Sequence, residues 1–429
     1  MAGNQKLKIV IIGAGSTYTP ELIEGLLKRK ALLNIGRLTL MDIDEKKLEI
    51  VGNLAKRMIA ADGVGWDVEF SADYGCIKGA DYVLTQIRVG QMRMRVLDEK
   101  IPLKYNLIGQ ETCGIGGFMK AYRTIPVLFA IADEIKKHAP DAYLINFTNP
   151  SGLVAQALNA KEIKSVGLCN CPFAMRRSVL SALCLADAQI DYVGLNHFAW
   201  ITAIRHNGKD YLEEAIKSGI HSEAMKNIPA NGFSAELLQT VGGIPSTYME
   251  YYYYPQKKLE TLLKEPLSRG EVCQKLEETL LKQYQEPSLN VKPKELEARG
   301  GAFYSEVAVG VLEAIENDTK SAQVVNVKNR GALPFLEDDD VIEISSVISK
   351  DRITPIGIDG FSNEHIIASV KMMKDYERMA VRAILSKNED DAICALMHNP
   401  LGKDYHAVRA CFRELRELNR AYIDGEALH

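Results

Sequence analysis

The sequence predicts an α/β protein, with a doubly wound parallel sheet in residues 1–172 and an α+β domain in residues 173–429. Apolar, strand-like runs alternate with amphipathic helical segments from residue 6 to about residue 170, which is typical of a parallel sheet with crossover helices. A glycine-rich turn follows the first of these runs. The chain of 429 residues is also too long for one ordinary core, which favours two closely joined domains.

The first elements predict a dinucleotide site. An apolar strand at residues 8–12 runs into a turn containing Gly13, Gly15 and Ser16, a helix follows at 20–30, and a second strand at 38–41 ends on Asp42. In such Rossmann-like units the glycines let the backbone approach a pyrophosphate, and the acid binds a ribose hydroxyl. Although Tyr18 stands where a third glycine is usual, this context favours NAD binding over a purely structural turn.

The rest of the first half continues the alternation. We expect helices at 46–61 and 123–137 and strands at 80–86, 142–147 and 165–168. Ligands of doubly wound sheets bind at the carboxyl ends of the strands. The segments that follow these three strands carry polar or reactive side chains, among them Arg88, Asn149 and Cys169.

The second half has a different pattern. Strands are expected at 191–195 and 199–204, followed by a hairpin turn at Asn207-Gly208. Helices follow over 259–286 with a break at Pro266, then strands at 324–327 and 341–348. A last long helix carries an apolar face from residue 366 to 384. We expect this α+β domain to cover the cofactor face of the first.

Composition excludes some classes of partner. The net charge of −4 gives no electrostatic reason to expect nucleic acid or an anionic membrane surface as a partner. We find neither a signal-like apolar segment at the N-terminus nor a membrane-spanning run of about 18 apolar residues. The eight cysteines follow no disulfide pattern, so we expect reduced thiols and a cytoplasmic protein.

Several residues could carry chemistry. Cys169 and His197 follow two strands and could together bind a divalent metal, or they could be a buried thiol and a core histidine. Cys171 could compete as the metal ligand. The glycine-rich loop 109–118 surrounds Glu111 and is either a lid or a catalytic loop.

Two further clusters each allow two interpretations. Arg88, Arg93 and Arg95 could bind phosphate or carboxylate groups, or could form a solvated helix face. Five tyrosines lie within residues 248–254. Aromatic packing explains most of them, and one could act as a base if a cation lowers its pKa.

As an ordered set, these motifs resemble the NAD- and metal-dependent family 4 glycoside hydrolases. The Cys-Asn-x-Pro form of the cysteine motif, with Asn170, is similar to the branch that cleaves 6-phospho-β-glucosides, because the 6-phospho-α branch has Asp at that position. The resembling segments are Ile12-Gly13-Ala14-Gly15-Ser16, Gln86-Ile87-Arg88-Val89-Gly90, Gly109-Gln110-Glu111-Thr112, Asn146-Phe147-Thr148-Asn149-Pro150, Cys169-Asn170-Cys171-Pro172, Leu195-Asn196-His197 and Arg299-Gly300-Gly301.

The resemblance implies hydrolysis of 6-phospho-β-glucosides by oxidation and elimination. NAD takes hydride from the sugar's C3, the C2 proton becomes acidic, the C1 substituent leaves, water adds, and NADH reduces C3 again. A divalent metal, usually Mn²⁺, acts as a Lewis acid at the C2 and C3 oxygens. NAD is then catalytic and is not consumed.

The resemblance also implies the roles of individual residues. Cys169 and His197 would be the metal ligands, and Gly13, Gly15, Ser16 and Asp42 would bind NAD. Tyr248 would be the C2 base, with Tyr251 as the second candidate, and Glu111 would raise its basicity. Arg95, Asn149 and Arg269 would bind the substrate.

The sequence leaves three competing functions open. An NAD-dependent 2-hydroxy-acid dehydrogenase would share the glycine turn, but it would consume NAD and need no metal. A noncatalytic nucleotide-binding protein would also use that turn, and a family 4 hydrolase of different sugar specificity would share all the motifs. Apolar helices, the tyrosine run and the resemblance favour a homodimer or homotetramer.

Overall fold

The computed structural model describes residues 6–218, 232–300 and 303–425 and contains a nine-stranded sheet in the order β13-β12-β11-β6-β5-β4-β1-β2-β3. Six neighbouring strands of this sheet, β6-β5-β4-β1-β2-β3, are parallel, and their order is typical of doubly wound dinucleotide folds. This confirms the predicted fold class. The strands of the sheet are β1 (Leu7–Ile12), β2 (Ile35–Met41), β3 (Asp67–Ser71), β4 (Tyr82–Thr85), β5 (Tyr143–Asn146), β6 (Ser165–Gly167), β11 (Ser321–Lys328), β12 (Val341–Ile348) and β13 (Ile353–Pro355).

A second, four-stranded sheet belongs to the second half of the chain. In it β8 pairs antiparallel with β7, with β10 and with β9. The β8–β9 connection is the expected turn at Asn207-Gly208, where both residues have positive φ (50° and 78°). Its strands are β7 (Gln189–Leu195), β8 (Phe198–His206), β9 (Lys209–Asp210) and β10 (Ile244–Pro245).

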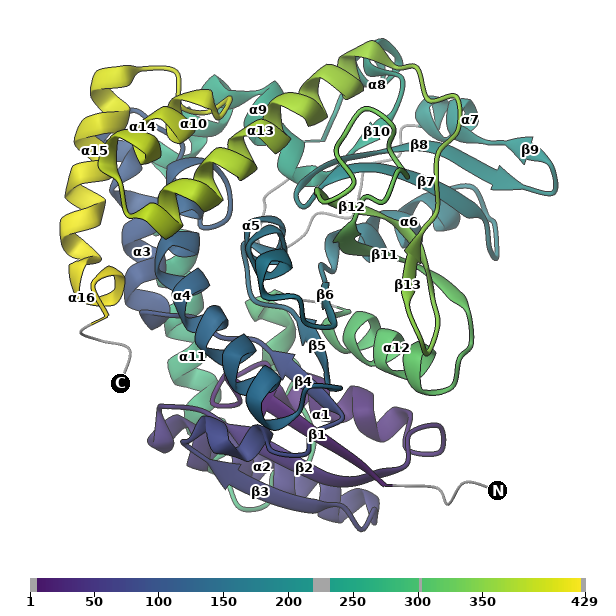
Figure 1. Ribbon diagram of the computed structural model, residues 1–429, viewed down its shortest axis with the longest axis vertical. Helices are drawn as coiled ribbons and strands as arrows, with labels where there is room; N and C mark the ends of the chain where they lie inside the picture. Colours follow the sequence, from purple (N-terminus) through teal and green to yellow (C-terminus); the bar gives the residue numbers. More distant parts are fainter. Residues whose placement is uncertain (1–5, 219–231, 301–302, 426–429) are drawn as a thin grey trace.

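Helices cover both faces of the large sheet (Figure 1). Ile9 and Ile11 of β1 belong to a core shared with α1, α2 and α12, whereas Val10 and Ile12 belong to a core shared with α4, α5 and α13. The α-helices are α1 (Thr19–Lys28), α2 (Glu45–Asp62), α3 (Gln91–Lys100), α4 (Gly114–His138), α5 (Ser151–Leu158), α6 (Cys171–Ala182), α7 (Leu212–Lys217), α8 (Ala235–Val241), α9 (Glu250–Tyr253), α10 (Pro255–Lys264), α11 (Arg269–Tyr284), α12 (Tyr304–Glu316), α13 (Glu364–Ser386), α14 (Glu389–His398), α15 (Tyr405–Leu418) and α16 (Arg420–Ile423).

The glycine-rich stretch 109–118 corrects one prediction. We expected a loop followed by a helix at 123–137, but α4 begins at Gly114. A Cβ on Gly116 would lie 2.3 Å from the carbonyl oxygen of Gln110, and one on Gly117 would lie 2.4 Å from the carbonyl carbon of Thr112. These glycines therefore let the first turn of a buried helix pack against the preceding loop. The local sequence alone does not distinguish glycines that permit close packing from glycines of a flexible loop.

Other differences concern how the second half joins the first. The strands expected at 324–327 and 341–348 exist, but they add antiparallel to the edge of the first sheet, where Asn326 pairs with Gly167. The edge strand β3 was not predicted, and α13 is not the last long helix, because α14 and α15 follow it. The break at Pro266 is confirmed by the gap between α10 and α11. The domain division at residue 172 stays a prediction.

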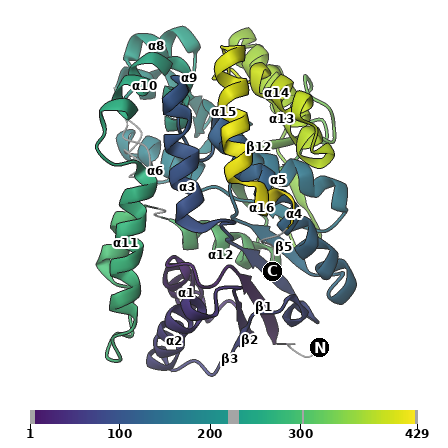
Figure 2. The same ribbon diagram turned by 90° about the vertical axis from the view of Figure 1, so that its left-hand side faces the viewer.

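Helix α11 belongs to the second half of the chain and packs against helices of the first half. It contacts α2 and α3, and Figure 2 shows it running along one side of the molecule from the region of α10 down to α2.

Within the described residues, one helix, α4, is long and apolar enough to cross a membrane. Its most apolar window is 78% buried inside the protein, as is usual for a core helix.

Candidate active site

A cavity of about 780 Å³ lies at the carboxyl ends of the parallel strands. Ten of the eleven site residues that the sequence singled out line it. The eleventh, Arg269, lies outside the lining formed by the described residues, and its guanidinium donates to the backbone carbonyls of Ala298 and Arg299 at 3.1 and 2.7 Å. The ten are Gly13, Gly15, Ser16, Asp42, Arg95, Glu111, Asn149, Cys169, His197 and Tyr248.

The turn after β1 forms one end of the cavity. Gly13 has φ +87°, and a Cβ there would lie 2.9 Å from the backbone of Gln86. Asp42 accepts the backbone N–H groups of Gly15 and Asp44 at 2.8 and 2.9 Å. A Cβ on Gly15 would lie 2.9 Å from the same carboxylate. Side chains at these two positions would block the close approach of the chain, so the turn fits a dinucleotide phosphate.

Cys169 and His197 lie together on the cavity wall. The Cys169 sulfur is 3.5 Å from the His197 Nε2, and both side chains are buried. One divalent ion bonded to both atoms at about 2.0–2.3 Å would span this separation. The described residues contain no group of three or more His, Cys, Asp or Glu side chains that could hold a metal. A metal bound here would therefore keep coordination positions for substrate or water.

The electrostatics of the pair suit a metal. Burial, with Lys120 nearby, lowers the pKa of His197 to about 3, so the imidazole is neutral and Nε2 can present a lone pair. Its Nδ1 is buried without a hydrogen-bond partner among the described residues. Burial also raises the pKa of the Cys169 thiol, so binding of a metal would release its proton. Cys171 is not among the described residues that line the cavity, and its sulfur lies 3.3 Å from the Ser246 hydroxyl.

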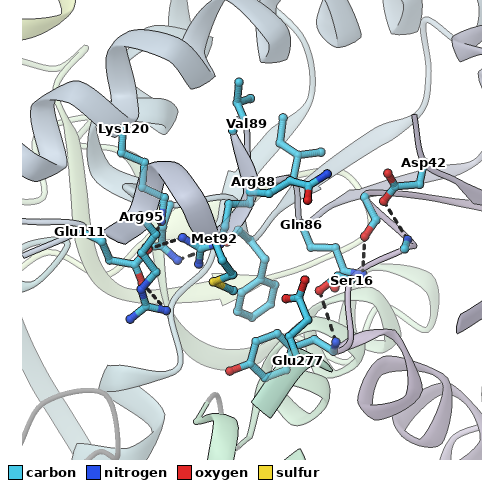
Figure 3. A pocket seen from close by; sticks show the side chains of 18 of the residues that line it. Ser16, Asp42, Gln86, Arg88, Val89, Met92, Arg95, Glu111, Lys120 and Glu277 are labelled. Carbon is cyan, nitrogen blue, oxygen red and sulfur yellow. Dashed lines mark hydrogen bonds and ion pairs between the residues drawn. The ribbon is translucent and has the colours of Figure 1, made fainter. Parts of the chain in front are cut away.

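Glu111 is surrounded by cations (Figure 3). Arg88 forms an ion pair with it, the Arg95 Nη1 lies 3.2 Å from Oε1, and the Lys120 Nζ lies 2.8 Å from Oε2. Burial alone would raise the pKa of Glu111, but the three cations hold it well below its usual value. Burial and Arg88 lower the pKa of Lys120 to about 7, against the opposing effect of Glu111. Arg95 also pairs with Glu99 at 2.9 Å, so three cations share two carboxylates at the end of the cavity opposite Asp42 (Figure 3).

Lys120 was missed by the sequence analysis. It lies in the part of α4 that we expected to be a loop or its margin, and the sequence offered no signal beyond a lysine within a mostly apolar segment. The neighbouring arginines were noticed as a cluster. Arg88 and Arg95 both reach Glu111, while the exposed Arg93 also lines the cavity.

Tyr248 lies against the candidate metal ligand. It belongs to a short 3-10 helix, η4 (Thr247–Met249), and its ring stacks on that of His197 with centroids 3.6 Å apart and an interplanar angle of 11°. Burial raises its pKa well above the usual value, and the neighbouring thiols and Glu111 raise it further. Tyr251 is also buried but is not among the described residues of the cavity wall. The geometry therefore favours Tyr248 of the two tyrosines that the sequence left open.

The remaining wall offers polar and aromatic contacts. Asn149 Oδ1 is buried without a hydrogen-bond partner in the described part of the chain, so it can accept a hydrogen bond from a ligand. Tyr304 packs on Phe147 with ring centroids 3.9 Å apart, and the guanidinium of Arg299 lies 4.3 Å from the ring of Tyr18. The sequence analysis did not single out this aromatic wall. Gly301, the last residue of the Arg-Gly-Gly motif, lies outside the described residues.

The sequence is similar to known families and to individual proteins. The model of the family 4 glycosyl hydrolases matches residues 8–185, and the model of the family 4 C-terminal domain matches residues 192–402. A probable 6-phospho-beta-glucosidase of Bacillus subtilis is 39% identical over 97% of both chains. The 6-phospho-beta-glucosidase of Escherichia coli is 38% identical over 93% of this chain and 92% of its own.

A solved structure shows the same fold. The 6-phospho-beta glucosidase of Thermotoga maritima, crystallised with manganese, NAD⁺ and glucose-6-phosphate, superposes with a TM-score of 0.89 at 32% sequence identity. The match covers 97% of this chain and 99% of that one.

Proposed function

The chain belongs to family 4 of the glycosyl hydrolases, and from this premise we propose that it hydrolyses 6-phospho-β-glucosides with bound NAD and a divalent metal such as Mn²⁺. One observation carries the proposal: a single cavity holds the glycine turn with Asp42, the Cys169–His197 pair and Tyr248. The names of the relatives favour the 6-phospho-β substrate class, and Asn170 is consistent with it.

The two bound groups would supply chemistry that side chains lack. NAD would accept hydride from the sugar's C3 and later return it, and Gly13, Gly15, Ser16 and Asp42 would hold it. A divalent ion held by Cys169 and His197 would act as a Lewis acid toward the sugar oxygens. Because two protein ligands leave coordination positions open, the sugar's hydroxyl groups could reach such an ion.

The side chains of this protein would position the sugar and move its C2 proton. Tyr248, stacked on His197, would accept that proton; its raised pKa makes the phenolate a strong base, although a cation must favour its formation. Glu111 would add to the basicity of Tyr248. Asn149 Oδ1 would accept a hydrogen bond from a sugar hydroxyl. Arg95, one of the three cations that share Glu111 and Glu99, would attract the phosphate.

Some expectations go beyond the geometry. Arg269 stays a predicted substrate ligand although it lies outside the cavity lining formed by the described residues, because loops that close over a substrate can bring such a residue closer. We likewise expect a cytoplasmic homodimer or homotetramer, with no nucleic acid or membrane partner.

Hydrolysis of a chromogenic 6-phospho-β-glucoside tests the proposal directly. The protein should release the chromophore only when both NAD and Mn²⁺ are present, over many turnovers and without steady accumulation of NADH. NADH formed in a one-to-one ratio with product would favour a dehydrogenase. Equal activity on the unphosphorylated β-glucoside, or activity confined to the 6-phospho-α-glucoside, would refute the substrate assignment.

A further inference from the structure

A buried carboxylate that the proposed chemistry does not use lies close to the candidate metal ligands. Glu343 belongs to β12 and is 1% exposed. Asn326 of β11 pairs with Glu343 on one side and with Gly167 of β6 on the other. Since Gly167 precedes Cys169 by two residues, the antiparallel extension of the sheet brings the Glu343 carboxylate beside the segment that carries the thiol.

Three uncharged groups donate hydrogen bonds to this carboxylate. Asn196 Nδ2 and Asn326 Nδ2 donate to Oε1 at 2.9 and 3.1 Å, and the Tyr192 hydroxyl donates to Oε2 at 3.1 Å. A buried carboxylate held by neutral donors is costly compared with one paired to a cation. Burial raises the pKa of Glu343 to about 7, and a cation bound nearby would favour the ionised carboxylate.

Asn196 connects Glu343 to both candidate ligands. It directly precedes His197, and its side chain also forms a hydrogen bond to Cys169, which opposes the larger effect of burial on the pKa of that thiol. The amide donates one N–H to the Glu343 carboxylate at 2.9 Å, and its Oδ1 accepts the Gly152 N–H at 3.3 Å. Glu343 and Gly152 therefore orient the amide together while it contacts the sulfur. A Cys169 thiolate and a Glu343 carboxylate together carry the charge that one divalent cation neutralises.

We propose that Glu343 is a positioning residue of the metal site, which holds the Asn196 amide against the Cys169 sulfur and adds negative charge that favours a divalent cation. This inference rests on the proposed function, because that function places the metal at Cys169 and His197. Carboxylates and amides behind metal ligands commonly orient them, and loss of one such partner typically weakens metal binding about 10- to 100-fold.

Direct Mn²⁺ binding tests the inference without relying on activity. Free Mn²⁺ is followed by its paramagnetic resonance signal while the NAD-loaded protein is titrated at about pH 8, above the pKa of about 7 to which burial raises Glu343. Glu343→Gln keeps the shape and an acceptor but removes the charge, so the Mn²⁺ Kd should rise about 10- to 100-fold. NAD affinity, measured by calorimetry, should stay within about twofold because the cofactor turn is distant from β12.

Tyr192→Phe is the matched control. It removes a hydrogen bond from the other carboxylate oxygen and leaves both the charge and Asn196 in place, so its Mn²⁺ Kd should stay within about threefold of the original. Asn196→Ser, which keeps the carboxylate and removes the amide bridge, should weaken Mn²⁺ binding as Glu343→Gln does, and it serves as the test if Glu343→Gln does not fold.

The outcomes separate this inference from the proposed function. Cys169→Ser should abolish Mn²⁺ binding, and if it does not, the metal assignment of the proposed function fails and the role of Glu343 fails with it. If Cys169→Ser abolishes binding while Glu343→Gln or its substitute Asn196→Ser stays within about threefold of the original Kd, only the role of Glu343 is overturned. An equal loss in Tyr192→Phe and Glu343→Gln would also overturn it, because general packing would then explain both.

Discussion

Replacing Glu111 by Gln should destabilise the protein strongly, because the carboxylate is the shared partner of three cations. The side chains of Lys120 and Arg95 are only 3% and 6% exposed, so water cannot replace the lost carboxylate. Arg95 keeps Glu99 as a partner at 2.9 Å, whereas Lys120 loses its ion pair. Glutamine preserves the shape of the side chain, so the effect reports the charge.

The magnitude follows from the burial of these groups. Breaking a buried ion pair by removing one partner costs about 3–5 kcal/mol. The entropy of unfolding is about 2.1 cal/mol/K per residue, which gives about 0.9 kcal/mol/K for 429 residues. The Tm of Glu111→Gln should therefore fall by about 3–6 °C.

The loss should grow as the pH falls. The pKa of Lys120 is about 7 in the folded protein, whereas it is about 10.4 in an unfolded chain. Between these values the unfolded chain binds the additional proton, so this lysine makes the free energy of unfolding increase with pH. In Glu111→Gln its folded pKa drops further, so the variant loses additional stability as the pH falls below about 7. This additional loss reaches about 1.4 kcal/mol for each unit of the drop once the pH is below the variant's own folded pKa, and it vanishes well above pH 7.

Calorimetric melting of both proteins at about pH 5.5 and about pH 8.5 measures both effects. The control is Asp133→Asn, which removes a carboxylate that pairs with Lys161 and is 58% exposed. A surface pair contributes less than about 1 kcal/mol, so the control Tm should change by about 1 °C or less at either pH. A Glu111→Gln shift no larger than the control's, or one equal at the two pH values, would refute the reasoning.

Three further predictions concern the reaction. Tyr248→Phe should lower kcat about 10²- to 10⁴-fold and abolish deuterium incorporation at the product's C2 in D₂O; exchange that survives here but vanishes in Tyr251→Phe would transfer the role of base to Tyr251. Asp42→Ala should weaken NAD binding measured by calorimetry and relax discrimination against NADP, because the carboxylate that would bind the ribose and repel a 2′-phosphate is lost. Asn149→Ala should raise KM about 2- to 10-fold with little change in Tm, since Asn149 Oδ1 has no partner among the described residues and Nδ2 makes only a long hydrogen bond, 3.4 Å to the Phe147 carbonyl. A clearly lowered Tm with an unchanged KM would show that this residue is only structural.

The sequence by itself determined the parallel half of the fold and the cofactor turn. These features depend on local properties: alternation of strand and helix patterns, glycines that permit a tight turn, and an acid at the end of a strand. Such patterns lie within about 40 residues of one another, so chain connectivity alone places Gly13, Gly15 and Asp42 together.

Only the tertiary structure decided between residues of the same type. Cys169 and Cys171 are two residues apart, yet only the first faces His197, because α6 begins at Cys171 and turns its side chain toward Ser246. Tyr248 likewise differs from Tyr251 in that its ring stacks on the ring of His197. Local sequence does not encode which side of a short turn faces a cavity formed by distant strands.

The structure alone also decided the charge balance around the site. Lys120 joins Glu111 because α4 begins earlier than its sequence pattern suggests, and Glu343 reaches the neighbourhood of Cys169 because β11 pairs with β6. The pairing of Asn326 with Gly167 joins positions 159 residues apart. Such contacts form only when the whole sheet assembles. Closing so long a loop costs conformational entropy, and burial across the entire core offsets that cost, whereas no local preference of the chain does.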